Sequence, residues 1–549
     1  MKNRNLLCGL LLLLSSVAMM NHGSVSSLWA ADNVRRRPDR DPIVDIANSR
    51  AEKAVAFYLD RLQKIPTDQE ICYGLAMGYS QLGDIGQAMA YLDSAVQAGL
   101  PFERFLAGPR NLFSRLYQSA QFQQYAADRP MELIHGPSLG AVTDTSACFW
   151  VRTLNETGVK LCVYEPEKPV NAIWSGVVHT ASRLDFTAVT QVSGLKSDTA
   201  YLYDVYLNDE KVILPQSTLF RTYPSDDSKP RFQVAFGGGA NYRPDNERQW
   251  DTILSHRPAA MLFLGDNVYI DFPEIPEVQR FCYYQRFSHP AYKRMAAATP
   301  IYAIYDDHDF GDNDVIGGPE IEVPAWKRAV WRVFKETFNN PYYGGGEEQP
   351  GCWFDFSIGP VDFFMLDCRY YHTDPTIPQR SMLGQVQKQW LLKKLHFSHA
   401  TFKVIASSVP WTFGTKPGRQ ITARGETIGA YDTWEGFPEE REEIFSFIEE
   451  NRIEGVYLIS ADRHRSDAWK IERENGYAFY EASTSHLTKD GEHKLMPNAI
   501  FSHRGKPMFG LLTFDLTLPD AEIVYQVRDI DDRLVDQLIV RLSQLRYHH

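Results

Sequence analysis

Hydrophobic positions follow three different patterns along the chain, and the changes of pattern divide it into three segments. Between about residues 40 and 125, apolar side chains recur every three to four positions, as in AEKAVAFYLDRLQKIP, which predicts amphipathic helices. From about residue 133, apolar and polar residues alternate in short runs such as SACFWVRT, VKLCVYEP, FTAVTQV and AYLYDVYL, which predict strands split by turns. Beyond about residue 230 the runs are apolar throughout, as in AAMLFLGD and GVYLISAD, which indicates strands buried on both faces of a sheet.

The helical segment contains two similar stretches. Ala54 and Ala88 stand about one 34-residue repeat apart, and the stretches end in Pro66 and Pro101. This pattern resembles the tetratricopeptide repeat over roughly one and a half repeats, which implies a helical region over residues 32–129. Because one repeat cannot bury its own face, we expect this region to pack on the next domain, with contact to a partner protein as the alternative.

The alternating segment includes the stretch GLKSDTAYLY. It resembles the fibronectin type III signature, in which a tyrosine, here Tyr201, follows a turn centred on a leucine, here Leu195. Ser197 stands where that family prefers proline. The resemblance implies a small β-sandwich over residues 133–223, to which we assign no chemistry.

The first residues have the pattern of a secretory signal. Lys2 and Arg4 precede the apolar run LLCGLLLLLSSVAMM, and small residues follow near Ala30 and Ala31. The run is too short and too early to favour a spanning helix, and no later stretch is long and apolar enough for one. The pattern predicts a signal peptide over residues 1–31 and an exported protein, periplasmic or extracellular.

Composition limits the choice of ligand. The net charge is −12 and no basic stripe stands out, which argues against nucleic-acid binding. An anionic substrate would therefore need a local positive feature such as metal ions. The cysteines form no CxxC pair, which argues against a zinc knuckle, and their number permits disulfides whose pairing the sequence leaves open.

Polar side chains follow three of the apolar runs. LGDNVYI ends in Asp266, IYDDHDFGDND continues into five aspartates and a histidine, and LISADRHRSD ends in Asp462 and His464. Ligands collect at strand ends in such sheets, and these oxygen and nitrogen donors suit divalent or trivalent ions. A cation would relieve the repulsion within the acidic cluster. The alternative is a scaffold whose acidic clusters are merely solvated.

Six motifs occur in a fixed order: GDNVY, DDHD with Asn313 downstream, LDCRYY, SSVPW, DTWEGFPEER and SADRH. In them the chain is similar to metallophosphatases of the alkaline phosphatase D (PhoD-like) family, over roughly residues 230–527. The resemblance implies a multi-domain protein in which residues 230–549 form a four-layer α/β/β/α sandwich with metals at the strand ends. The last stretch, RDIDDRLVDQLIVRLSQLRYHH, predicts an amphipathic C-terminal helix after a β-hairpin.

The resemblance also implies roles for individual residues. The implied metal ligands are Asp266, Tyr269, Asp307, Asp309, Asn313, Asp462 and His464. Asp309 stands where the family usually has glutamate. His308 matches an acid or phosphate-contacting histidine, and Arg369 is a candidate for holding substrate oxygens. The implied reaction is hydrolysis of a phosphate mono- or diester by water activated on divalent or trivalent ions, such as calcium or iron.

One departure from the family concerns the first strand, which ends in AFGGGANY. Glycines 237–239 stand where a metal-binding cysteine is expected. The turn could bring backbone N–H groups to a phosphate, or Asn241, Tyr242 or Arg243 could substitute, or one metal could be lost. The alternative function is therefore a non-catalytic relative that binds a phosphorylated glycan, lipid or protein.

Overall fold

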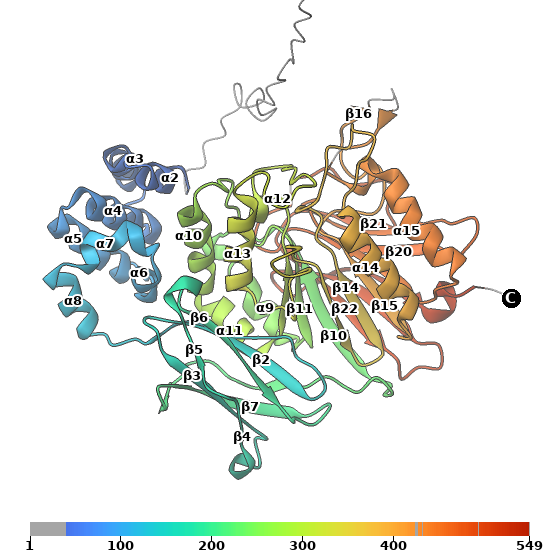
Figure 1. Ribbon diagram of the computed structural model, residues 1–549, viewed down its shortest axis with the longest axis horizontal. Coiled ribbons are helices and arrows are strands. Elements are labelled where there is room, and N and C mark those ends of the chain that lie inside the picture. Colours follow the sequence, from blue (N-terminus) through green and yellow to red (C-terminus); the bar gives the residue numbers. More distant parts are fainter. Residues whose placement is uncertain (1–39, 423–426, 431, 492, 548–549) are drawn as a thin grey trace, which may run out of the picture.

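The computed structural model describes residues 40–422, 427–430, 432–491 and 493–547. The predicted signal peptide, residues 1–31, lies outside this part of the chain. Among the residues that are described, no helix is both long and apolar enough to cross a membrane. Figure 1 shows a helical region, a region of small sheets and a larger region of paired sheets and helices, in chain order.

The helical region begins with α2 and ends with α8. Its helices are α2 (Asp41–Ala47), α3 (Ala51–Lys64), α4 (Gln69–Leu82), α5 (Ile85–Gln97), α6 (Glu103–Ala107), η1 (Arg110–Phe113), α7 (Ser114–Tyr117) and α8 (Ala120–Ala127). The Asp68 carboxylate caps α4, and Gly83 ends it in the left-handed conformation. Ala54 and Ala88 are fully buried where α3, α4 and α5 pack together. The predicted helices are confirmed, while the tetratricopeptide assignment stays a prediction.

The second region contains two small sheets. The first pairs β1 (Leu133–Gly140), β2 (Ser146–Thr153) and β6 (Thr187–Ser193); the second contains β3 (Gly158–Tyr164), β4 (Ile173–Trp174), β5 (Val178–His179), β7 (Ala200–Leu207), β8 (Glu210–Lys211) and β9 (Phe220–Arg221). Phe149 of the first sheet packs on Tyr203 of the second, with ring centroids 4.6 Å apart. The Tyr201 hydroxyl accepts the N–H of Lys196. The predicted strands are present, and the fibronectin type III assignment stays a prediction.

The third region contains two large mixed sheets. One has the order β12-β11-β10-β22-β23-β24 and the other the order β13-β14-β15-β18-β20-β19-β21. The first consists of β10 (Arg231–Gly237), β11 (Ala260–Leu264), β12 (Ile301–Ile304), β22 (Met508–Asp515), β23 (Glu522–Asp529) and β24 (Leu534–Arg541). The second consists of β13 (Phe354–Ile358), β14 (Val361–Met365), β15 (Phe402–Ala406), β18 (Val456–Ser460), β19 (Ser466–Ile471), β20 (Phe479–Thr484) and β21 (Phe501–His503). The apolar runs AAMLFLGD and GVYLISAD form β11 and β18, as predicted.

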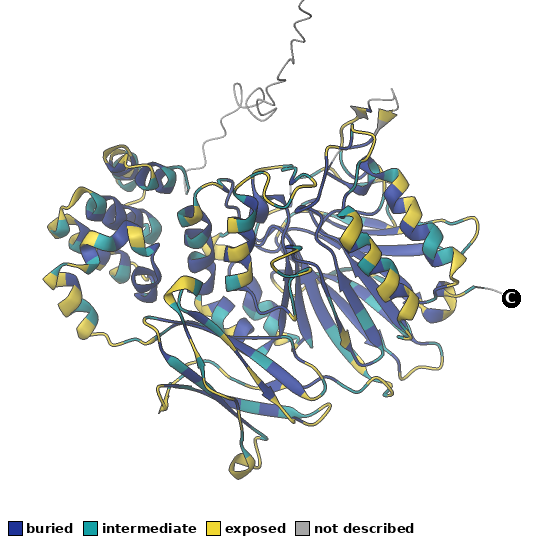
Figure 2. Ribbon diagram, viewed as in Figure 1, coloured by how far each residue is buried: buried dark blue, intermediate teal, exposed yellow. Residues whose placement is uncertain are grey.

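Helices flank the two sheets. They are α9 (Gln249–Ser255), α10 (Pro276–Phe287), α11 (Pro290–Ala298), α12 (Asp307–Phe310), α13 (Lys327–Thr337), α14 (Gly384–Phe397) and α15 (Pro438–Glu450). Figure 1 shows α10 and α13 on one side of the sheets and α14 and α15 on the other. Figure 2 shows the strands between them as mostly buried, which explains why their sequences are apolar throughout. Strands β10, β11 and β12 run parallel, so their carboxyl ends meet at one edge.

The predicted C-terminal helix is wrong. Asp532, with φ +61°, turns the chain back, and β24 then pairs antiparallel with β23 before the short η6 (Leu542–Leu545). Leu538 and Val540 lie opposite Tyr525 and Ile523 in this pairing. The stretch is rich in β-branched residues and its helical pattern is weak. Pairing with the unpaired backbone N–H and C=O groups at the edge of β23 therefore favours a strand.

Candidate metal centre

Asp266 follows β11 at the carboxyl edge of the first sheet. Its side chain is buried, and its backbone adopts φ +50°, a conformation that strains most side chains but that aspartate tolerates. The Tyr269 hydroxyl donates to Asp266 Oδ2 at 2.8 Å. Asp266 Oδ1 is buried and has no hydrogen-bond partner among the described residues. Burial raises the pKa of Asp266 to about 7.

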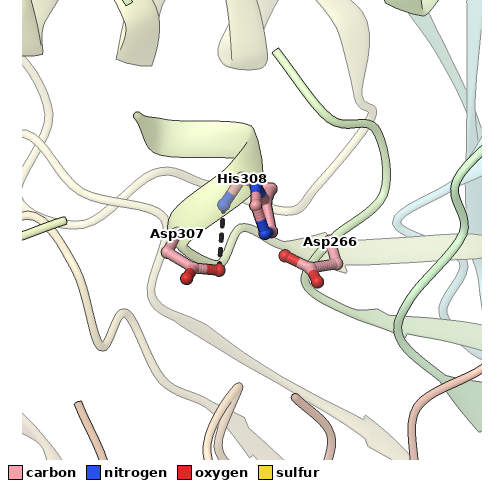
Figure 3. Close-up of side chains that lie close together, drawn as sticks. All are labelled: Asp266, Asp307 and His308. Atoms are coloured by element: carbon pink, nitrogen blue, oxygen red, sulfur yellow. Dashed lines mark hydrogen bonds between the residues drawn. The ribbon is translucent and has the colours of Figure 1, made fainter. Parts of the chain in front are cut away.

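Asp307 and His308 begin α12, directly after β12. One ligand atom each from Asp266, Asp307 and His308 lies within 4.8 Å of the others. Figure 3 shows the His308 ring between the two carboxyl groups. The Asp307 carboxylate accepts the backbone N–H groups of His308 (2.9 Å) and Asp314 (2.7 Å). His308 Nδ1 lies 2.5 Å from Asp271 Oδ1, which leaves Nε2 for the space between the carboxylates.

The two histidines of the site differ in pKa. Burial opposes the charged form of His308, but Asp307, Asp266 and the hydrogen bond to Asp271 raise its pKa to about 10. Burial and the Lys489 ammonium lower the pKa of His464 to about 3. His308 therefore favours the protonated ring, whereas His464 is a neutral imidazole with the Lys489 ammonium 3.3–3.4 Å from its two ring nitrogens.

The Asp462–His464 turn comes from the second sheet, after β18. His464 Nε2 lies 3.2 Å from the Tyr269 hydroxyl and 3.7 Å from Asp266 Oδ2. Asp462 and His464 both have positive φ, +65° and +38°, and their turn is closed by a hydrogen bond from His464 N to Asp462 O. The structure thus brings Asp266 and Tyr269, from the loop after β11, together with His464, from the turn after β18.

Arg369 is fully buried behind the site. Its Nε donates to Asp306 Oδ1 at 2.5 Å, and Ser408 donates to the same oxygen. Arg369 Nη1 and Nη2 have no hydrogen-bond partner among the described residues. In the structure, the Arg369 guanidinium forms an ion pair with the Asp306 carboxylate. Contact of Arg369 with substrate oxygens stays a prediction.

Asp309 and Asn313 lie differently from the other predicted ligands. The Asp309 carboxylate accepts the backbone N–H groups of Asp306, Asn267 and Val268 at 3.0–3.1 Å, so it ties the loop after β11 to α12. Asn313 is exposed on the loop after α12. The structure thus gives Asp309 a loop-fixing role, and ligation by either residue stays a prediction.

The glycine turn after β10 does not cradle a phosphate through its first N–H groups. Those of Gly238, Gly239 and Ala240 donate to the carbonyls of Thr484, Gly265 and Asp266. A Cβ on Gly238 would lie 2.8 Å from both Ala461 Cβ and the Gly265 carbonyl oxygen. The glycines therefore let β10 approach the loops after β11 and β18, and no side chain fits at Gly238 without a shift.

Asn241, Tyr242 and Arg243 lie further along this turn. They line a cavity of about 410 Å³ between the helical region and the sheets, together with Tyr269. The Asn241 carbonyl accepts the Thr488 hydroxyl, and the Tyr242 ring lies near the Arg286 guanidinium. Substitution of the missing ligand by one of these three stays a prediction.

The donor set fits a metal ion of oxygen and nitrogen preference. Carboxylate oxygens of Asp266 and Asp307 converge with a ring nitrogen of His308, and the His464 imidazole and the Tyr269 phenol lie beside Asp266. The buried Asp266 Oδ1 lacks a hydrogen-bond donor, and a cation would satisfy it and favour the ionised carboxylate. Burial first, and then the neighbouring Asp307 carboxylate, raise the pKa of Asp266 and so disfavour its charged form without such an ion.

Sequence reasoning missed several residues of the site. Asp271 holds His308, and Arg40, which precedes α2, pairs with Asp271 at 3.0 Å. Lys416 and Asp432 form an ion pair beside Asp307 and Asp314. Asp432 begins the motif DTWEGF, but no spacing in the sequence links it or Lys416 to the strand ends.

Comparison with known proteins gives two family matches. Residues 234–505 match the family described as PhoD-like phosphatase, and residues 130–225 match a domain of unknown function (DUF7800). Alkaline phosphatase D of Bacillus subtilis (strain 168) is 27% identical over 324 residues, 50% of this chain and 53% of that protein. The chain thus spans about half the length of this curated relative.

Two solved structures show the same fold. One described as the structure of PhoD has a TM-score of 0.58 and 18% identity, over 73% of this chain and 91% of its own. A purple acid phosphatase from yellow lupin (Lupinus luteus) seeds has a TM-score of 0.54 and 12% identity, over 74% and 75%. The mixed-sheet architecture is therefore a fold that this chain shares with these two proteins. Residues 234–505 of this chain belong to the PhoD-like phosphatase family.

Proposed function

We propose that the protein is an exported, metal-dependent phosphoesterase that hydrolyses phosphate mono- or diesters. The observation that carries the proposal is the convergence of Asp266, Asp307 and His308 within 4.8 Å, with His464 beside Asp266. Membership of residues 234–505 in the PhoD-like phosphatase family supports this reaction class.

Asp266, Asp307, His464 and Tyr269 are the side chains that would hold the metal. A bound divalent or trivalent ion supplies a water of lowered pKa and neutralises charge on the phosphate oxygens. The Tyr269 hydroxyl orients Asp266 through its hydrogen bond, and it also lies beside His464. These contacts fix the ligands before an ion arrives, which reduces the cost of ordering them.

His308 is the proton donor in this proposal. Asp271 accepts the Nδ1 proton, which orients the ring and leaves Nε2 directed between the carboxylates. A protonated imidazole at this place can give its Nε2 proton to the leaving oxygen as the phosphorus–oxygen bond breaks. Burial opposes the protonated ring, but Asp307, Asp266 and the hydrogen bond to Asp271 raise the pKa of His308 in the metal-free site.

The alternative, a relative that only binds a phosphorylated partner, is favoured by Gly238, which leaves the first strand without a ligand. An assay of chromophore release from a chromogenic phosphate monoester and diester, run on metal-loaded wild type and on Asp266→Ala, separates the two functions. Turnover that is lost in Asp266→Ala supports the phosphoesterase. Phosphate-dependent binding without turnover in the wild type supports the alternative.

A further inference from the structure

A second group of carboxylates lies beside the first. Oxygen atoms of Asp307, Asp314 and Asp432 come within 4.8 Å of one another, from the start of α12, the loop after it and the segment before η5 (Trp434–Gly436). Because Asp307 belongs to both groups, the two are contiguous. Such an arrangement would otherwise suit a second cation next to the first.

The Lys416 ammonium lies in this second group. Lys416 Nζ donates to Asp314 Oδ1 at 2.6 Å and also to Asp432 Oδ2, and its side chain is only 17% exposed. The preceding carbonyl, of Thr415, accepts hydrogen bonds from Arg463 Nε (3.2 Å) and Arg465 Nη2 (3.1 Å). These two arginines frame His464, so the lysine is anchored to the same turn that completes the metal centre.

The surrounding charges leave little room for a second metal ion. Arg369 Nη2 lies 3.9 Å from the same Asp432 oxygen that accepts from Lys416, so two positive groups already face it. A divalent ion among these carboxylates would meet the ammonium at short range, where like charges repel strongly in a buried site. The absence of a ligand side chain after β10 also argues against a second metal ion. Gly238 cannot carry a side chain without displacing Ala461 or the loop at Gly265.

We propose that Lys416 is a built-in cation that takes the place of a second metal ion, so that the centre holds one ion, at Asp266, Asp307 and His464. This inference rests on the proposed function for the first ion. The ammonium pairs with both Asp314 and Asp432 and offsets part of their negative charge without an exchangeable ion.

The test is the number of Mn²⁺ ions bound per full-length chain, measured by equilibrium dialysis with elemental analysis. We expect about one equivalent in the wild type, about one in Lys416→Arg and about two in Lys416→Met, because removing the charge opens the three-carboxylate group to an ion. Lys403→Met is the matched control. Lys403 is also buried, and its ammonium donates to the carbonyls of Ala400 and Glu454 away from the site.

Three results separate this inference from the proposed function. Two equivalents in the wild type, one of them lost in Asp432→Asn, would overturn the role of Lys416 and leave the phosphoesterase standing. A count that stays at about one in a folded Lys416→Met protein would also overturn it. No uptake by the wild type would remove the metal-dependent phosphoesterase itself. If Lys416→Met does not fold, the Mn²⁺ counts of the wild type and Asp432→Asn still test the inference. One bound Mn²⁺ per chain in both proteins supports it.

Discussion

Arg40 and Asp271 form an ion pair, with 3.0 Å between Nη2 and Oδ2, that joins the start of the helical region to the candidate metal centre. Arg40 Nη1 also donates to the Tyr269 carbonyl at 2.5 Å, across 229 positions of sequence. Asp271 in turn lies against His308 Nδ1. The helical region therefore supports the site directly, in addition to packing on the sheets.

We expect Arg40→Ala to lower kcat about 10-fold while KM changes little, because Asp271 loses the cation that holds it against His308. Arg40→Lys should restore part of the loss. Arg50→Ala is the control, since Arg50 pairs with Asp45 within the helical region. Steady-state kinetics on a phosphate ester measures the effect, and equal kcat in Arg40→Ala and wild type would show that Arg40 has no positioning role.

Replacing His308 by glutamine should lower turnover by about 10² or more for an alkyl phosphate ester, which needs a proton on its leaving oxygen. The loss should be much smaller for a nitrophenyl ester, whose leaving group departs unprotonated. His256→Gln, at a surface pair with Asp532, is the control. Equal losses with the two esters would exclude His308 as the acid and leave it a structural or ligand role.

The metal-free protein should lose stability as pH rises through the range in which Asp266 ionises. Burial raises its pKa from 3.8 to about 7, so the native state binds this proton more tightly than the unfolded state, and the contribution of Asp266 to the free energy of unfolding falls between these values. Metal binds the ionised form, so the rise in Tm on adding Mn²⁺ should grow from about pH 5 to about pH 8.

Differential scanning fluorimetry across that pH range measures this rise. In Asp266→Asn, which cannot ionise, the rise in Tm should be smaller and nearly independent of pH. A Tm rise in the wild type that is already complete at the acidic end would contradict the assigned shift in the pKa of Asp266.

Gly238→Ala should lower the free energy of unfolding by about 1–3 kcal/mol, because its Cβ would press on Ala461 Cβ and the Gly265 carbonyl oxygen at 2.8 Å. Gly176→Ala is the control, because nothing lies within 4 Å of a Cβ built there. Urea unfolding measures both variants, and equal stabilities would show that the turn tolerates a side chain and that a ligand could be restored there.

Much of the fold could be predicted from the sequence because the local pattern and the tertiary environment agree. The run AAMLFLGD is apolar throughout and forms β11, buried on both faces. The helix predicted for the C-terminal stretch was wrong, because its hydrophobic pattern was mixed and pairing with the edge of β23 determined its conformation. Such a pairing depends on the three-dimensional position of another strand, which periodicity does not report.

The candidate site was predictable where its residues end strands. Asp266, Asp307 and His464 follow β11, β12 and β18, and the structure places Asp266 near both Asp307 and His464. Arg40 and Lys416 come from segments without a strand or a motif, and their ion pairs depend on how distant loops meet. A charged residue in such a segment has no sequence signal that distinguishes it from an ordinary solvated one.

The most direct measurement is turnover of a chromogenic phosphate ester by the full-length protein, compared between the metal-loaded wild type, the chelator-treated wild type and Asp266→Ala. We expect hydrolysis in the first, recovery on adding metal back to the second, and a loss of about 10³ or more in the third. Hydrolysis that survives both the chelator and the loss of the Asp266 carboxylate would contradict this expectation.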